Sequence, residues 1–361
     1  LLRSGLKFPF STGDRGAIGG VGGTRNCDWW FADQAILLDT AGRYTSEDED
    51  QEEWVAFLRM VKRFRKKRPL NGLLVAVSIA DLMTASREDV EASATKIRSR
   101  IDQVISELDL ALPVYVLITK CDLISGFVQT FGNMKKSTRS QVFGFTVPLT
   151  SPTTDVEKLF QKEFDLLSSR LQKRTLARLA RAKSHDRSAI YKFPMQFGAT
   201  RDVLSSFVGQ LMMANPYVEM PRLRGIYFCS GTQEGRPLDT LMGAMGQALG
   251  LRGVDTPGLE QKAAKKSYFL RDVFTRVIFP DQDVAGTSAA GSSRARRLGI
   301  VALAVGFLAA ATAVVGYAVS FGNNSEMVSA TVKLAKQSRL VTPEDPRKVL
   351  GSIRAVDALG A

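Results

Sequence analysis

Cysteine and histidine are scarce in this chain of 361 residues, which contains three cysteines and one histidine. Cys27, Cys121 and Cys229 stand far apart, in none of the paired spacings that bind zinc or haem. An odd and sparse set argues against a disulfide framework and fits a reducing compartment. His185 lies in a run of basic and polar residues, where a solvated position is expected rather than a catalytic one. The sequence therefore indicates neither a zinc site nor a histidine-based active site.

Charged residues are absent from residues 298–321, a stretch of 24 residues. At about 1.5 Å per residue, a helix of this length crosses a bilayer core about 30 Å thick with some tilt. Soluble helices of such a length rarely lack a charged face. This stretch therefore predicts one transmembrane helix.

The charges that flank the stretch predict its orientation. The net charge is +13, and Arg294, Arg296 and Arg297 come directly before the stretch, whereas residues 322–331 contain no Lys or Arg. Because positive charge is retained on the cytoplasmic side, residues 1–297 are expected in the cytoplasm and residues 322–361 across the membrane. Residues 281–297, rich in Gly, Ala and Ser, are expected to form a flexible linker.

Near the N-terminus, residues 27–31 and 35–39 form two apolar runs that predict a β-hairpin. The second run ends in Asp39-Thr40-Ala41-Gly42, and a strand followed by D-x-x-G is a GTPase signature. Asp39 could bind the water shell of Mg²⁺, and Gly42 would let the backbone N–H approach a γ-phosphate. Thr24, in a glycine-rich stretch, is a second candidate for Mg²⁺; an ordinary loop is an equal alternative there.

A strand, a helix and a second strand are predicted next. Residues 71–80 form a nearly continuous apolar run, as in a strand covered on both faces, and residues 112–119 show the same character. Between them, residues 87–109 repeat apolar side chains at spacings of three and four, which predicts a helix. Ligand sites of α/β sheets lie at the carboxyl ends of the strands. We therefore expect a doubly wound, G-type (P-loop GTPase-like) α/β domain over residues 1–150.

The second of these strands ends in Thr119-Lys120-Cys121-Asp122, the T-K-x-D form of another GTPase signature. The Asp122 carboxylate could accept hydrogen bonds from both N1–H and N2–H of guanine, while the Lys120 stem packs over the base. Adenine presents no matching donor pair. A solvated turn is the alternative, and residues 142–150 contain no serine-alanine signature that would complete a guanine site. GTP or ATP with Mg²⁺ is the expected cofactor.

A phosphate loop is missing, because no G-x-x-x-x-G-K-[ST] pattern occurs in the chain. Without it, the β- and γ-phosphates lack their principal cradle. Either the domain is degenerate or the loop lies just upstream of Leu1. Residues 1–5 are typical of a helix that ends on a glycine, as a phosphate-loop helix would, and favour the second explanation. Whether the domain is an NTPase stays open.

Residues 151–280 are expected to form a mostly helical extension, since residues 156–179 carry an apolar helix face. Basic residues crowd two stretches, 170–187 and 62–68. Nucleic-acid binding would explain such charge, but the chain shows little aromatic interleaving and no recognised motif. Solvated faces near an anionic membrane surface are the favoured interpretation.

Several longer blocks span nearly the whole chain: GTRNCDWWF at 23–31, LDTAGRY at 38–44, RGIYF at 224–228, SGTQEG at 230–235, KSYFLRD at 266–272 and VIFP at 277–280. Together these blocks resemble the IcmF/TssM family of bacterial secretion-system subunits.

The resemblance implies an inner-membrane core subunit of a type VI secretion system, with residues 298–321 as its third transmembrane helix and residues 322–361 opening a periplasmic region. It implies homo-oligomerisation and three partners: a DotU/TssL-type inner-membrane protein, a TssJ-type outer-membrane lipoprotein and the baseplate. Nucleotide would then act as a conformational input. The alternative is a pure scaffold whose G-like domain binds no nucleotide.

Overall fold

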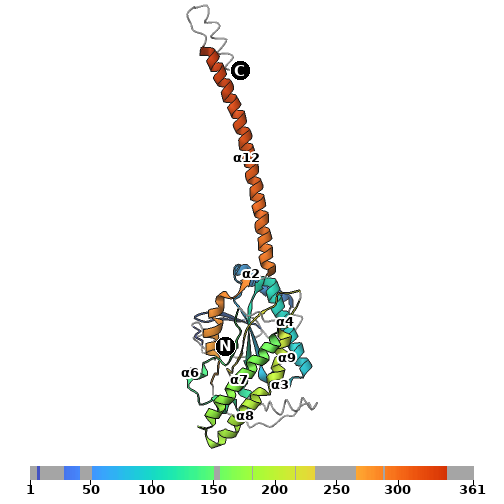
Figure 1. Ribbon diagram of the computed structural model, residues 1–361, viewed down its shortest axis with the longest axis vertical. Helices are drawn as coiled ribbons and strands as arrows, with labels where there is room; N and C mark the ends of the chain where they lie inside the picture. The colour runs from blue at the N-terminus through green and yellow to red at the C-terminus, as the bar shows by residue number, and fades with distance from the viewer. Residues whose placement is uncertain are drawn as a thin grey trace, which may run out of the picture. The chain divides into compact units, whose positions relative to one another are not determined.

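The computed structural model describes residues 6–8, 28–40, 51–149, 155–180, 182–215, 217–231, 266–287 and 289–339. The chain divides into two compact units, Leu1–Gly291 and Ser292–Ala361. The first unit is a mixed α/β fold in which helices outweigh strands (Figure 1). Its main elements are β1 (Asp28–Phe31), β2 (Ile36–Asp39), α2 (Gln51–Phe64), β3 (Leu73–Ser78), α3 (Ile79–Thr84), α4 (Arg87–Leu108), β4 (Leu110–Ala111), β5 (Pro113–Thr119), α5 (Phe127–Phe131), α6 (Lys136–Arg139), β6 (Gly144–Thr146), α7 (Val156–Leu179), α8 (Arg187–Gly198), α9 (Arg201–Leu211), β7 (Arg222–Phe228), α11 (Arg271–Val273) and β8 (Gly286–Thr287).

A four-stranded sheet with the order β3-β5-β7-β6 forms the centre of this unit. The first three strands are parallel and β6 is antiparallel to β7. The register pairs Ser78 with Thr119 and Ile118 with Phe228, so the carboxyl ends of the parallel strands meet at one edge. Because β7 belongs to this sheet, the domain boundary predicted at residue 150 separates strands of one sheet.

The long helices cover one face of the sheet. Alternate residues of β5, namely Val114, Val116 and Ile118, are fully buried in the large core that these helices share. Helices α4 and α7, both predicted from their apolar spacing, are confirmed and contribute their apolar faces to it. Phenylalanines fill the space between β7 and α7–α8, and the rings of Phe164 and Phe197 stack with centroids 4.9 Å apart. Close aromatic packing therefore fixes these helices on the sheet.

The opposite face carries shorter elements. Tyr115 of β5 packs in a second cluster with Leu37 of β2 and Phe274, which begins a π-helical turn (Phe274–Ile278) after α11. The predicted hairpin is confirmed, since β1 and β2 pair antiparallel. It forms a sheet of its own, however, rather than extending the central one. A doubly wound sheet, which the sequence predicted, has helices on both faces. In the described residues, the long helices cover one face of this sheet and only shorter elements cover the other.

Strand β3 differs from the strand predicted over residues 71–80. Only Val75 and Ser78 of β3 are buried, and Leu74 is 38% exposed, so the prediction of cover on both faces is wrong. The exposed residues Leu74 and Ala76 pair with Tyr115 and Leu117 and share their face, and the shorter elements on that face bury β5 but leave the outer strand β3 exposed. In the described ranges β3 pairs only with β5, and it is therefore an edge strand of the sheet.

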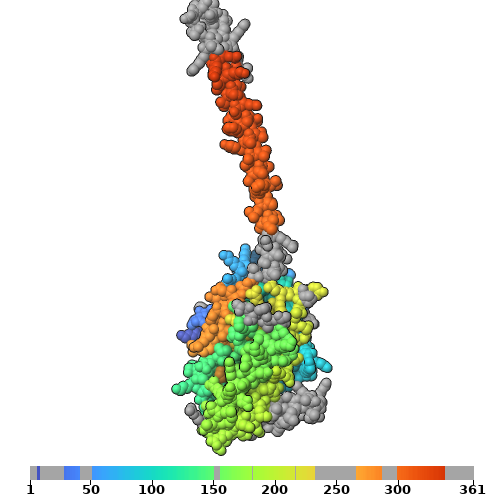
Figure 2. All heavy atoms as spheres, viewed as in Figure 1, coloured from blue at the N-terminus to red at the C-terminus, as the bar shows by residue number. Residues whose placement is uncertain are grey.

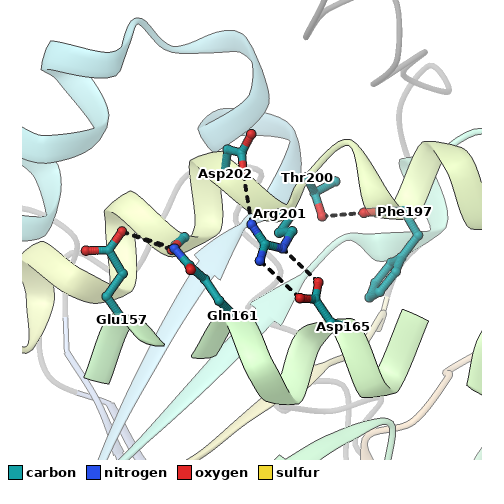
Figure 3. A network of polar contacts seen from close by, with 8 residues as sticks. Glu157, Gln161, Asp165, Phe197, Thr200, Arg201 and Asp202 are labelled. Atoms are coloured by element: carbon teal, nitrogen blue, oxygen red, sulfur yellow. Dashed lines mark hydrogen bonds and ion pairs between the residues drawn. The ribbon is translucent and has the colours of Figure 1, made fainter. Parts of the chain in front are cut away.

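Polar contacts on the surface connect α7 and α9 (Figure 3). Arg201 donates to both carboxylate oxygens of Asp165, at 2.8 and 3.1 Å, and also pairs with Asp202. Gln161 donates to Ser205 at 2.9 Å. Exposed pairs of this kind contribute at most about 1 kcal/mol. The apolar side chains that α7 and α9 bury therefore contribute more to the packing of the two helices than these surface contacts do.

Helix α12 runs from Ala289 to Arg339, and its segment Gly299–Gln337 is long enough to cross a membrane and contains an 18-residue window with a mean hydropathy of 2.3. It includes most of the predicted span. Its 39 residues make a helix of about 58 Å, longer than a bilayer core of about 30 Å, so only part would cross.

The structure differs from the linker predicted over residues 281–297. Its first residues belong to a short 3-10 turn, Pro280–Asp283, and β8 then pairs antiparallel with β4. The helix begins at Ala289, since alanine favours helix despite the neighbouring Gly and Ser. Residues 340–361 of the predicted periplasmic region lie outside the described residues.

Candidate functional site

The turn that follows β5 is held by both neighbouring strands. The Thr119 hydroxyl donates to the carbonyl of Val77 in β3 at 3.0 Å. The backbone N–H of Cys121 donates to the carbonyl of Cys229, just after β7, at 3.2 Å. Three predicted site residues, Thr119, Lys120 and Asp122, thus lie together at the carboxyl edge of the sheet.

Lys120 and Asp122 have opposite environments. Lys120 adopts a left-handed backbone conformation, with φ 56° and ψ 30°, which costs a non-glycine residue about 1–2 kcal/mol. This conformation starts a short 3-10 helix, Cys121–Leu123. Lys120 is exposed at the edge, whereas Asp122 is only 6% exposed. A strained residue beside a buried carboxylate is typical of a functional turn.

Ser230 fixes the orientation of the Asp122 carboxylate. Its hydroxyl donates a short hydrogen bond to Oδ1 of Asp122, and Ser230 itself is fully buried. The backbone of Ser230 exchanges two hydrogen bonds with that of Tyr268, at 2.8 and 3.1 Å. Residues from three distant parts of the chain therefore hold one carboxylate in place.

Burial dominates the electrostatics of this site. It raises the pKa of Asp122, while the hydrogen bond from Ser230 and the positive charge of Lys120 act in the opposite direction. Burial also raises the pKa of the Cys229 thiol to about 12 and that of Cys121 well above its ordinary value. Both thiols are therefore protonated near neutral pH and poor nucleophiles.

The raised pKa of Asp122 predicts a pH dependence of stability. The folded state holds this proton more tightly than the unfolded state, so the free energy of unfolding falls as pH rises from about 3.8 through the raised pKa. Asp122→Asn keeps the side chain's shape and removes the titration. Urea unfolding between about pH 4 and pH 7 should show the native protein losing stability relative to Asp122→Asn as pH rises. Parallel profiles would contradict this assignment.

Of the other predicted site residues, the structure describes only Asp39. Asp39 ends β2, in the separate two-stranded sheet, while Thr24 and Gly42 lie outside the described residues. Within the described ranges, no group of three or more His, Cys, Asp or Glu side chains is arranged to hold a metal ion. The roles of Thr24 and Asp39 toward Mg²⁺ stay predictions.

Ser230, which contacts Asp122, was not predicted from the sequence. Residues 142–150, where a serine-alanine signature was sought, contain the short edge strand β6. Ser230 follows β7, the strand next to β5, and is 108 residues from Asp122 in the sequence. The available signal was the run 225–229 (GIYFC), which has no charged residue and is followed by Ser230-Gly231-Thr232, so that it repeats the strand-then-polar-turn pattern of the other two parallel strands.

A second polar cluster lies near the amino ends of β5 and β7, and we call its three members Tyr115, Arg224 and Asp281 the Asp281 cluster. The Tyr115 hydroxyl donates to Oδ2 of Asp281 at 2.8 Å, and Arg224 donates to both oxygens, at 2.6 and 3.3 Å. The Arg224 and Asp281 side chains are only 16% and 14% exposed. Burial, then the bond to Asp281, raises the pKa of Tyr115.

This cluster connects the candidate site to the segment that precedes α12. Asp281 belongs to the turn Pro280–Asp283, and α12 begins at Ala289. Asp122 and Ser230 follow the carboxyl ends of β5 and β7. The same two strands bind the segment that precedes α12 near their amino ends.

Comparison with known proteins adds two matches. The family model described as the IcmF-related N-terminal domain matches residues 47–306. The type VI secretion system component TssM1 of Pseudomonas aeruginosa is 38% identical over 374 residues, an alignment that covers 99% of this chain and 34% of that protein. The chain therefore spans about a third of this relative's length. No solved structure matches the chain.

Proposed function

The chain belongs to the IcmF/TssM family, and from this membership we propose that it is part of an inner-membrane subunit of a type VI secretion complex. In this proposal the first unit is cytoplasmic, α12 crosses the inner membrane, and residues 322–361 begin the periplasmic region. The family match supports it because residues 47–306 include both most of the α/β unit and the start of the apolar helix. The three arginines before the helix support the orientation.

We further propose that the carboxyl edge of the sheet binds a guanine nucleotide with Mg²⁺. The observation that carries this proposal is the contact between Ser230 and Asp122, beside the exposed Lys120. A fixed carboxylate can accept both N1–H and N2–H of guanine, and such charge-assisted hydrogen bonds are strong. The aliphatic stem of Lys120 can lie over the base.

The phosphates require a phosphate loop, and the 361 residues contain no G-x-x-x-x-G-K-[ST] pattern. The strand leading into such a loop would find a place at the open edge of β3, where Leu74 is exposed. Asp39 and Thr24 would then serve the Mg²⁺. The bound nucleotide would act as a conformational input to the secretion complex.

The partners follow from the family alone. We propose a DotU/TssL-type inner-membrane protein, a TssJ-type lipoprotein reached through the periplasmic region, baseplate components and further copies of this subunit. Nucleic acid is not among them, because the basic stretches carry no recognised nucleic-acid motif.

A scaffold without nucleotide is the second candidate, and one observation favours it. Asp122 is 6% exposed and already accepts a hydrogen bond within the protein, which a purely structural carboxylate would also do.

Type VI secretion by cells that carry single variants separates the two candidates. Asp122→Asn should reduce secretion at unchanged protein level, because the amide cannot accept both guanine donors. The matched control is Asp202→Asn, since the Asp202 side chain is 91% exposed on α9. Equal secretion by both variants would favour the scaffold.

A further inference from the structure

The C-terminal turn of α2 and the residues that follow it carry a dense positive charge. Residues 62–68, KRFRKKR, contain six basic residues around one phenylalanine, and we call them the basic turn. Residues 63–68 are exposed, and Phe64 is 79% exposed. At this exposure the Phe64 ring buries little surface against the rest of the unit.

Contacts with acidic residues hold the two ends of the basic turn. Lys62 donates to Asp109 at 2.6 Å and to the carbonyl of Glu107 at 2.8 Å. Arg68 forms an ion pair with Asp283. In the part of the chain that the structure describes, the four basic residues between these ends form no ion pair: Arg63, Arg65, Lys66 and Lys67. Their charge is therefore available to an anionic partner.

The position of the turn indicates which partner that is. Arg68 contacts Asp283, and Asn71 donates to the carbonyl of Gln282 at 2.7 Å. From Asp283, six residues lead to the start of α12 and ten helical residues lead on to Gly299, where the apolar segment begins. These stretches reach at most about 20 Å and about 15 Å. Asp283, which holds one end of the basic turn, therefore lies within about 35 Å of the start of the apolar segment.

We propose that the basic turn binds anionic phospholipid headgroups of the membrane that α12 crosses, with Phe64 entering the interface. Polybasic segments next to a membrane span are attracted by anionic lipids, and amphipathic or aromatic side chains favour the interfacial layer. This proposal rests on the proposed membrane insertion of α12. The ion pairs at Lys62 and Arg68 would keep the turn in a fixed orientation on the α/β unit.

A second basic surface provides a matched control. Tyr191 on α8 is 62% exposed and lies beside the exposed Arg187 and Lys192. Within the first unit, α8 lies at the end opposite α2 (Figures 1 and 2). It has similar chemistry but, in the described residues, no such contact with the segment that precedes α12.

The test uses the full-length protein in lipid nanodiscs, with Cys27 and every other cysteine except the buried Cys121 and Cys229 replaced by serine, and an environment-sensitive fluorophore on Phe64→Cys or on Tyr191→Cys. In discs with phosphatidylglycerol, the probe at position 64 should shift to shorter wavelength and be quenched by lipid-borne quenchers. It should recover in discs of phosphatidylcholine alone, or at about 1 M salt, where the Debye length is about 3 Å.

Three outcomes would overturn the proposal. A probe at position 64 that stays exposed to water in anionic discs would overturn it and leave the membrane anchor intact; an acidic protein would then be the partner. Equal quenching at position 191 would show that charge, and not position, causes the lipid contact. A protein that does not incorporate into discs would overturn the proposed membrane insertion first.

Discussion

Replacing Asp281 with alanine is expected to lower the free energy of unfolding by about 3–5 kcal/mol, the usual loss when one partner of a buried charge pair is removed. The variant would leave the guanidinium of Arg224 and the hydroxyl of Tyr115 without their shared acceptor, in a site where the Arg224 side chain is 16% exposed. Urea unfolding followed by tryptophan fluorescence, in detergent, measures this loss.

Asp283 provides the control for this prediction. It lies two residues further along and also pairs with an arginine, Arg68, but the two side chains are 73% and 49% exposed. Asp283→Ala should therefore cost at most about 1 kcal/mol. If both variants unfold at the same urea concentration, the Asp281 cluster does not hold the segment before α12 on the sheet.

The periodic elements of this fold could be predicted from local sequence. Helices α4 and α7 begin and end within a residue of their predicted bounds, since spacings of three and four require only neighbouring residues. The hairpin and strand β5 were likewise predicted from patterns among neighbouring residues. The burial of β3 could not be predicted in this way, because it depends on the place of the strand in the sheet and on the elements that pack over each face, and an apolar run carries no such information.

The candidate site was predictable only in part, for the same reason. Thr119, Lys120 and Asp122 are consecutive or nearly so, and the motif identified them. Ser230 was missed because the strand order brings it to Asp122 across 108 residues. The Asp281 cluster likewise joins residues 57 and 166 positions apart. Contacts of this kind are set by sheet order, which pattern reading does not supply.

The chemistry of Asp122 predicts a second large effect, a change in which base is bound. Guanine offers donors at N1 and N2, whereas xanthine has a carbonyl oxygen in place of the 2-amino group. An asparagine offers one acceptor and one donor, which match N1–H and this carbonyl. Losing one hydrogen bond to a charged group costs about 1.5–3 kcal/mol. Asp122→Asn should therefore weaken GTP binding on the order of 100-fold and improve xanthosine triphosphate binding.

Ser230→Ala should behave differently. It removes the hydroxyl that orients the carboxylate but keeps both carboxylate oxygens. It should weaken GTP binding by about 0.5–1.5 kcal/mol, roughly 2- to 12-fold, without changing the preferred base.

The most direct test is therefore the ratio of GTP to xanthosine triphosphate affinity, measured by displacement of a fluorescent nucleotide from the full-length protein with Mg²⁺. A guanine site at the carboxyl ends of β5 and β7 predicts that the native protein prefers GTP and that Asp122→Asn prefers xanthosine triphosphate. The same preference in both proteins, or no binding by either, would contradict it.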